Sequence, residues 1–236
     1  SLGLVGSEMC IRDRHYITNE YDLVSIIIPS KDNPDILKCC LQSIRKFTKY
    51  INYEIVVVDN GSNDSNRKEY EKLVGTFEGQ ASYVYEKADF NFSHMCNVGA
   101  AKAKGNLLLF LNDDIEIIGQ DYEDTDWLSV LVGQAKQEST GPVGAKLLYP
   151  DSSYIQHVGV INYESSCFAH LYAKAVDDEN IKAHRNYADY DCLCVTGACF
   201  MIEKAKFDKA GGFDEAFEVT HNDVDICLTL YEQGYY

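Results

Sequence analysis

Two adjacent carboxylates, Asp113 and Asp114, follow five consecutive apolar residues, Leu107–Leu111, with only Asn112 in between. Such a run is typical of a strand that is buried on both faces of a sheet. Neighbouring like charges repel each other, and close to a protein core they also lose hydration. A bound cation would remove this conflict, and carboxylate oxygens suit Mg²⁺ or Mn²⁺. The alternative is that the two acids simply end a strand and solvate a turn.

Polar residues also follow two other apolar runs. The runs 23–29 (LVSIIIP) and 54–58 (EIVVV) predict buried strands, of which the first is followed by 30–32 (SKD) and the second by 59–62 (DNGS). In open α/β sheets, ligands bind outside the carboxyl ends of the strands. The three strand ends are therefore the candidate site.

The segments between these strands have helical character. Apolar residues at helical spacing predict a helix in 35–50. A polar helix is predicted at about 65–78, and a third begins with Ser93 as its N-cap and ends with Gly105 as its C-cap. The alternation of strands and helices predicts right-handed βαβ units and a mostly parallel sheet.

The pattern loosens after about residue 140. Short strand pieces are followed by an irregular stretch, 165–191, and then by a strand with a short helix from about 203. A final helix is predicted with Val224, Cys227, Leu228 and Tyr231 on one face.

The composition narrows the class of protein. A hydrophobic content of 46% in 236 residues predicts a folded globular chain, and the net charge of −16 argues against a non-specific nucleic-acid binder. A phosphate-bearing ligand remains compatible, because a divalent metal can supply positive charge locally. Nine scattered cysteines without a CxxC pair indicate free thiols in a reducing compartment. Neither GxGxxG nor GxxxxGK[ST] follows a strand, which disfavours dinucleotide-binding and P-loop folds.

Five segments, in this order, resemble the family 2 glycosyltransferases. They are VSIIIPSKDNPDILKCCLQSI, YEIVVVDNGSND, FNFSHMCNVGAAKAKGNLLLFLNDDIEII, YPDSSYIQHVGVI and VTGACFMIEKAKFDKAGGFDEAFEVTHNDVDICLTLYEQGY, and they span about 23 to 236. Within that family the chain resembles bacterial enzymes that build cell-surface polysaccharides, including rhamnosyltransferase-like proteins. The resemblance implies the GT-A fold, a Rossmann-like and mostly parallel sheet flanked by helices, with an irregular C-terminal half that receives the acceptor.

The resemblance also implies roles on the donor side. The family's DxD motif falls on Asn112-Asp113-Asp114, with Asn in place of the first acid. Asp114 is expected to bind the metal, and Asp113 the ribose or a metal-bound water, so both contribute to the metal site. Asp59 is expected to accept a hydrogen bond from the ring N–H of uracil or thymine, unless it only shapes its turn. Pro29, Ser30, Asp32 and Gly61 are expected to line the base and ribose pocket, and Lys31 either reaches a phosphate or is simply exposed.

On the acceptor side, Asn222-Asp223-Val224-Asp225 matches the family's ED region, with Asn222 in place of the usual glutamate. Asp223 is the expected catalytic base, because residues two apart on a helix lie on different faces and Asp225 would not reach the same proton. Helix capping is the competing explanation. His157, His170 and His221 are either ordinary core and surface residues or, for His170, part of the acceptor side.

Together these expectations describe a metal-dependent, inverting, hexosyl-type glycosyltransferase. It would move a sugar from a UDP- or dTDP-sugar to a glycan or lipid-linked acceptor, with no nucleic-acid partner. One alternative is a non-catalytic module for sugar nucleotides or glycans, or an inactive fragment. A nucleotidyltransferase is disfavoured, since it would need a glycine-rich basic loop where PSKDNPD stands.

We expect a single GT-A domain over residues 21–236, with residues 1–20 as a tail outside it. The segment SLGLVGSEMCIRDR shows no clear period and is left out of the fold argument, although it could be a real N-terminal extension. A strand is expected after the last helix, so the domain is expected to continue past residue 236. In many relatives a histidine in that continuation completes the metal site. The expected location is the cytoplasm, with a peripheral position at the inner membrane left open.

Overall fold

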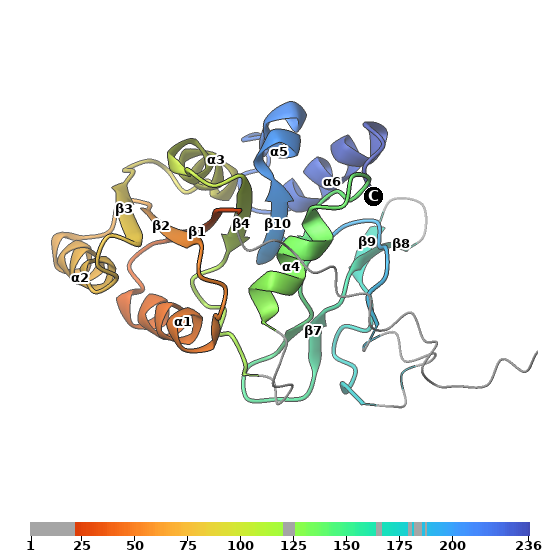
Figure 1. Cartoon of the computed structure of the whole chain (residues 1–236), viewed down its shortest axis with the longest axis horizontal. Coiled ribbons are helices and arrows are strands. Elements are labelled where there is room, and N and C mark those ends of the chain that lie inside the picture. Colours follow the sequence, from red (N-terminus) through yellow and green to blue (C-terminus); the bar gives the residue numbers. More distant parts are fainter. Residues whose placement is uncertain (1–21, 120–125, 164–166, 179–180, 182–185, 187) are drawn as a thin grey trace, which may run out of the picture.

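The computed structural model describes residues 22–119, 126–163, 167–178, 181, 186 and 188–236, so the expected tail lies outside the described residues. A six-stranded sheet in the order β3-β2-β1-β4-β10-β5 forms its centre (Figure 1). The strands β1 (Val24–Ser30), β2 (Tyr53–Asp59), β3 (Ala81–Tyr85) and β4 (Leu107–Leu111) are parallel. β10 (Cys199–Glu203) runs antiparallel to β4 and to β5 (Val143–Gly144). The mostly parallel sheet expected from the sequence is confirmed.

Helices cover both faces of the sheet because successive side chains of its strands point to opposite sides. Ile26 and Ile28 of β1 pack with residues of α1 (Pro34–Phe47), α2 (Asp64–Gly75) and α4 (Trp127–Ala135). Ile27 packs on the other side with residues of α3 (Phe92–Lys102), α5 (Lys204–Ala210) and α6 (Asn222–Glu232). All three isoleucines are fully buried, so β1 is sandwiched between two apolar layers.

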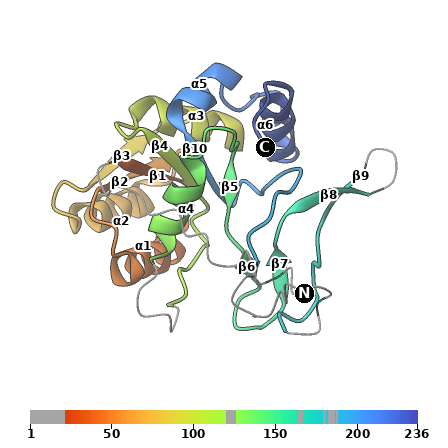
Figure 2. The same ribbon diagram turned by 45° about the vertical axis from the view of Figure 1, so that its right-hand side comes forward.

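Two small antiparallel sheets extend from this core (Figure 2). One pairs β6 (Leu147–Leu148) with β7 (Ile155–His157), and the other pairs β8 (Val160–Tyr163) with β9 (Cys167–His170). Cys194 forms an isolated bridge with Val160, which places the stretch before β10 beside the start of β8. The expected irregular half therefore contains more strand than the sequence indicated.

The ends of α3 differ from the prediction. Its N-cap is Asn91, whose side-chain oxygen accepts a hydrogen bond from His94 N, because Ser93 instead donates to the carbonyl of Phe217. The C-cap is Ala103. Gly105 serves close packing: a Cβ there would lie 2.4 Å from the carbonyl oxygen of Leu23.

The buried face of α6 was also predicted incorrectly in part. Val224 and Cys227 are buried as expected, but the face continues through Ile226 and Leu230, while Tyr231 is 52% exposed. These residues of α6 pack in the apolar layer that also contains residues of the sheet, α3 and α5, which the sequence pattern of α6 alone could not show.

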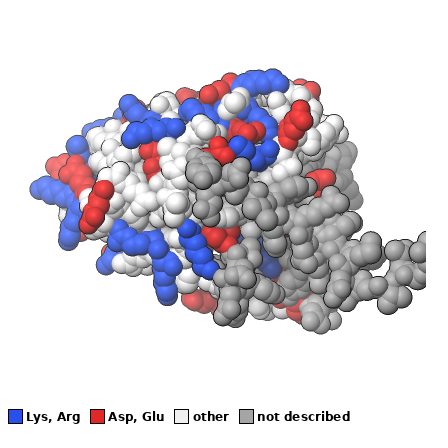
Figure 3. Space-filling view, viewed as in Figure 1, with Lys and Arg blue, Asp and Glu red and all other residues white. Residues whose placement is uncertain are grey.

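The structure also shows the state of the cysteines and the distribution of charged side chains on the surface. Among the described residues, seven cysteines are free. The described part of the face in Figure 3 carries basic side chains interspersed with acidic ones.

None of the helices in the described ranges has the length and apolar character needed to cross a bilayer.

Candidate functional site

The carboxyl ends of β1, β2 and β4 meet at one edge of the sheet. Ser30 is in register with Asp59, and the Ser30 hydroxyl donates a 2.5 Å hydrogen bond to Asp113 Oδ2. The strand order reverses between β1 and β4, which is the switch point where open α/β sheets bind ligands. Ser30, Asp59 and Asp113, predicted separately as site residues, therefore lie together.

The two acids after β4 have different surroundings. Asp113 is half-buried, and burial together with the neighbouring charge of Asp114 raises its pKa, against the effect of the Ser30 hydrogen bond. Asp114 is exposed and lines a pocket of about 210 Å³ beside α1, together with Asp35, Ile36, Cys39 and Glu116.

The acid pair offers the carboxylate oxygens that a divalent cation such as Mg²⁺ prefers. Over the described ranges, no ion pair joins a lysine, arginine or histidine to Asp113 or Asp114. Nor do these ranges contain a group of three or more His, Cys, Asp or Glu side chains that could enclose a metal ion. Two carboxylates with the remaining ligands from phosphate and water are a common arrangement for Mg²⁺.

Asp59 is fully buried at the end of β2. Its Oδ1 accepts a 2.8 Å hydrogen bond from Ser62 N, and its Oδ2 accepts one from the Tyr83 hydroxyl. Burial and this bond raise the pKa of Tyr83. The turn function of Asp59 is thus present in the structure. Each carboxylate oxygen has a second lone pair, but the side chain has no exposed surface, so a hydrogen bond to a base would require the turn to move.

The loop after β1 is joined to the start of α2 through Asp32. Its Oδ1 accepts hydrogen bonds from the backbone and side chain of Asn63, at 3.0 and 2.7 Å, and from the Asn66 side chain at 2.9 Å. These bonds lower the pKa of Asp32, and the bond from the Asn66 side chain has the largest effect. Gly61 adopts φ +77°, which a glycine tolerates best. Pro29 is partly buried within β1. These predicted residues lie at or just after the ends of β1 and β2, beside Asp59.

Asp223 reaches the same edge through the three-residue segment Thr196-Gly197-Ala198, here called the 196–198 segment. Asn112 N donates to Ala198 O at 3.0 Å, so this segment lies against the end of β4. Gly197 N donates to Asp223 Oδ2 at 3.0 Å, and Val224 N donates to Asp223 Oδ1 at 2.9 Å. The 196–198 segment therefore links the predicted base to Asn112, the residue that directly precedes the acid pair.

Asp225 lies in a different environment on α6. Burial and the neighbouring Asp214 raise its pKa, and no hydrogen bond joins its side chain to the 196–198 segment within the described residues. The two acids of α6 therefore differ in the way that their separation along the helix predicts.

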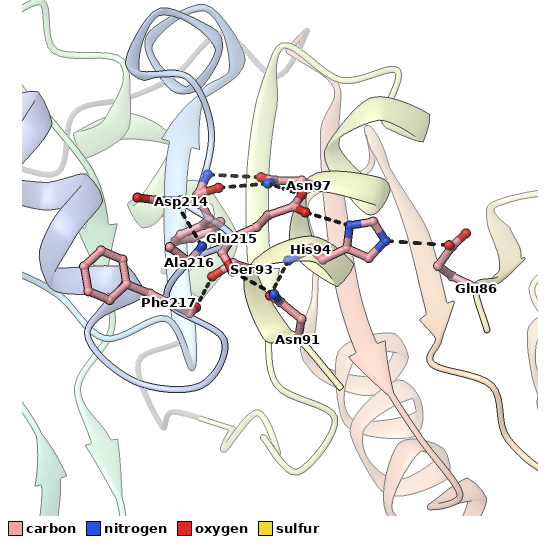
Figure 4. Close-up of polar contacts among 10 residues, drawn as sticks. Glu86, Asn91, Ser93, His94, Asn97, Asp214, Glu215, Ala216 and Phe217 are labelled. Carbon is pink, nitrogen blue, oxygen red and sulfur yellow. Dashed lines mark hydrogen bonds and ion pairs between the residues drawn. The ribbon is translucent and has the colours of Figure 1, made fainter. Parts of the chain in front are cut away.

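The start of α6 is set by the preceding loop, 213–218, which is docked on α3 (Figure 4). Asn97 donates to Phe213 O and Glu215 Oε1 and accepts from Phe213 N, all at 2.9–3.0 Å. His94 lies between Glu215, 3.0 Å from its Nδ1, and Glu86, 3.6 Å from its Nε2.

Sequence reasoning missed the 196–198 segment and the Asn97 anchor. Both depend on contacts between residues far apart in the chain: Gly197 and Asp223 are 26 positions apart, and Asn97 and Phe213 are 116. A glycine beside an apolar strand does suggest close approach of another group. That signal does not identify the group.

Similarity to known proteins agrees with this geometry. Residues 25–211 match the family model described as Glycosyl transferase family 2. The O-antigen biosynthesis protein RfbC of Myxococcus xanthus is 35% identical over 214 residues, which are 89% of this chain and 16% of that protein. The chain spans less than a quarter of the length of the curated relatives it matches first.

Two solved structures share the fold. One is the mannosyltransferase PcManGT from Pyrobaculum calidifontis in complex with GDP-Man and Mn²⁺, with a TM-score of 0.63 and 16% identity, covering 90% of this chain and 52% of that one. The other is GalNAc-T7 with UDP, GalNAc and Mn²⁺, with a TM-score of 0.69 and 17% identity, covering 91% and 41%. The fold is thus GT-A, and the chain belongs to glycosyl transferase family 2.

Proposed function

We propose that the chain is the catalytic domain of a metal-dependent, inverting glycosyltransferase. It transfers a hexosyl-type sugar from a UDP- or dTDP-sugar to a glycan or lipid-linked acceptor. The observation that carries this proposal is the joining of two sites by the 196–198 segment, which contacts Asn112 on one side and Asp223 on the other. A donor held at the acid pair and an acceptor held near Asp223 would meet there.

Asp223 acts as the general base. Its carboxylate accepts the proton of an acceptor hydroxyl while that oxygen forms a bond to the anomeric carbon and the bond to the diphosphate breaks. Each oxygen of Asp223 receives one backbone N–H and keeps a lone pair for the acceptor. The two hydrogen bonds hold the carboxylate in one orientation.

Asp113 and Asp114 would hold Mg²⁺ or Mn²⁺. The bound metal would supply positive charge for the leaving diphosphate. The same charge would relieve the repulsion between the two adjacent acids. Pro29, Ser30, Asp32 and Gly61 shape the pocket for base and ribose, and Asp59 accepts the ring N–H of the base.

The similarity to RfbC supports a role in bacterial cell-surface polysaccharide synthesis. The Mn²⁺ and nucleotide sugars in the titles of the two structures of the same fold support a metal and a nucleotide-sugar donor. A cytoplasmic location, with an acceptor presented at the inner membrane, stays a prediction, as does the extent of the domain over 21–236.

The test is a thermal-shift screen in Mn²⁺ and in EDTA with UDP-glucose, UDP-galactose, UDP-N-acetylglucosamine, dTDP-rhamnose and GDP-mannose. We expect a UDP- or dTDP-sugar to raise Tm in Mn²⁺ and much less in EDTA. Asp114→Asn should abolish that difference and leave the fold intact. An assay for hydrolysis of the stabilising donor then distinguishes the alternatives: an enzyme would release the nucleoside diphosphate and the free sugar, and a binding module would not.

Equal stabilisation with and without metal would overturn the metal assignment. A Tm rise without any sugar release would favour the binding module over the enzyme. Selective stabilisation by GDP-mannose would overturn the proposed donor class.

A further inference from the structure

His157 is a buried polar residue that the proposed reaction does not use directly. It ends β7 and is only 2% exposed. Its Nδ1 lies 2.8 Å from Nδ1 of His170 on β9, and its Nε2 lies 3.4 Å from Thr196 N. Thr196 belongs to the 196–198 segment, so His157 reaches the backbone that also contacts Asp223.

The contacts of His157 determine where its proton lies. A backbone N–H can only donate, so His157 Nε2 accepts from Thr196 and carries no proton. A neutral His157 then carries its proton on Nδ1 and donates it to His170 Nδ1. Burial and the neighbouring His170 lower the pKa of His157 to about 3, in agreement with a neutral ring. The Thr196 N–H thus selects the Nδ1–H tautomer of His157, and His170, which is exposed, accepts that proton.

The 196–198 segment transmits this restraint to Asp223. The Thr196 amide is held by His157, the next amide, Gly197 N, donates to Asp223 Oδ2 at 3.0 Å, and Ala198 O accepts from Asn112 N. Because consecutive peptide units share an α-carbon, fixing the Thr196 N–H limits the direction of the Gly197 N–H.

We propose that His157, held in one tautomer between the Thr196 N–H and His170, is a positioning residue for the catalytic base Asp223, acting through the Thr196-Gly197 backbone. This inference rests on the proposed function of Asp223. His157 touches neither donor nor acceptor. Its role is to keep the Gly197 N–H, and with it the Asp223 carboxylate, at the orientation that the acceptor hydroxyl requires. A small misplacement of a reacting group can cost about 10²-fold in rate.

The test compares kcat and donor KM of matched variants, using the sugar nucleotide selected by the thermal-shift screen. His157→Leu removes the acceptor for Thr196 N–H, and His157→Gln keeps a carbonyl oxygen at similar reach. We expect His157→Leu to lower kcat by about 10- to 100-fold with donor KM unchanged. His157→Gln should have a kcat close to that of the natural chain.

His170 supplies a second pair of variants at an exposed position, in case His157→Leu fails to fold. His170→Leu removes the acceptor for His157 Nδ1–H, and His170→Asn keeps an amide oxygen near that position. We expect His170→Leu to lower kcat and His170→Asn to restore it. Equal kcat in these two variants would overturn the tautomer argument.

A double variant shows whether His157 acts through Asp223. In the Asp223→Asn background, His157→Leu should cause no further loss of kcat. A folded His157→Leu variant with full kcat, or one whose loss adds fully to that of Asp223→Asn, would overturn the inference and leave the proposed function standing. Full turnover by Asp223→Asn would instead overturn the base assignment, and the inference with it.

Discussion

At the scale of single residues, Asp113 combines a cost to stability with a proposed gain in function. Burial and Asp114 raise its pKa, so the folded state binds a proton on this group more tightly than the unfolded state does. Its contribution to stability is therefore largest at low pH and declines as the pH rises through the folded pKa. At neutral pH, without metal, its charge destabilises the fold.

Asp113→Asn removes the charge and keeps an oxygen that accepts the Ser30 hydroxyl. We expect its Tm at pH 7 in EDTA to be a few degrees higher than that of the natural chain, with the difference shrinking toward pH 4. With Mn²⁺ and the donor present, we expect the natural chain to have the higher Tm of the two. A lower Tm of the variant in EDTA would mean that the charged Ser30–Asp113 bond stabilises the fold.

Substitution of Asp59 tests whether this carboxylate binds the base of the nucleotide. Asp59→Asn can still accept from Ser62 N through its oxygen and can offer its amide to the Tyr83 hydroxyl, so the buried turn should persist. A ring N–H of uracil would lose a charged acceptor. We expect UDP affinity in Mn²⁺, measured by calorimetry, to fall by about 1.5–3 kcal/mol. Unchanged affinity would leave Asp59 with its turn function alone, and Tyr83→Phe is the control for altered packing.

At the scale of elements, the loop 213–218 and α3 together determine where α6 begins. Asn97 is central, because its side chain makes three hydrogen bonds to Phe213 and Glu215. We expect Asn97→Ala to lower the free energy of unfolding by about 1–3 kcal/mol, measured by urea denaturation, since it leaves partly buried partners unsatisfied. It should also lower kcat, because α6 carries Asp223.

Lys102→Ala, at an exposed position near the end of the same helix, is the matched control and should change neither quantity. Stability and turnover equal to those of the natural chain in Asn97→Ala would show that the loop is held in place without this anchor.

The elements also show which features a single sequence can predict. The apolar runs of β1, β2 and β4 and the polar residues after them were predictable, because a fully buried strand needs no knowledge of its neighbours. The N-cap of α3 was not, since Ser93 is a good cap by type but donates to Phe217, 124 positions away. Asp223 was found by resemblance to the family. Its partners, Gly197 and the His157–His170 pair behind it, appear only in three dimensions.

At the scale of the molecule, the proposed donor and acceptor functions fall on different parts of the chain. Predicted donor residues lie at or just after the ends of β1, β2 and β4 in the N-terminal half. Asp223 and the His157–His170 pair belong to the C-terminal half, which contacts the N-terminal half through the pairing of β10 with β4, the loop 213–218 on α3 and the hydrogen bond of the 196–198 segment to Asn112. Because the donor residues lie in the N-terminal half, a ligand that resembles only the donor should affect mainly that half.

Hydrogen–deuterium exchange with UDP and Mn²⁺ tests this division. We expect slower exchange in peptides covering 30–33, 59–63 and 112–116, where the diphosphate and base would contact the strand ends, and little change in 155–163 and 167–170. The effect at 112–116 should vanish in EDTA and in Asp114→Asn, because the metal would link that segment to the diphosphate. Protection centred on 155–170, or equal protection of 112–116 with and without metal, would contradict the division of donor and acceptor between the two halves.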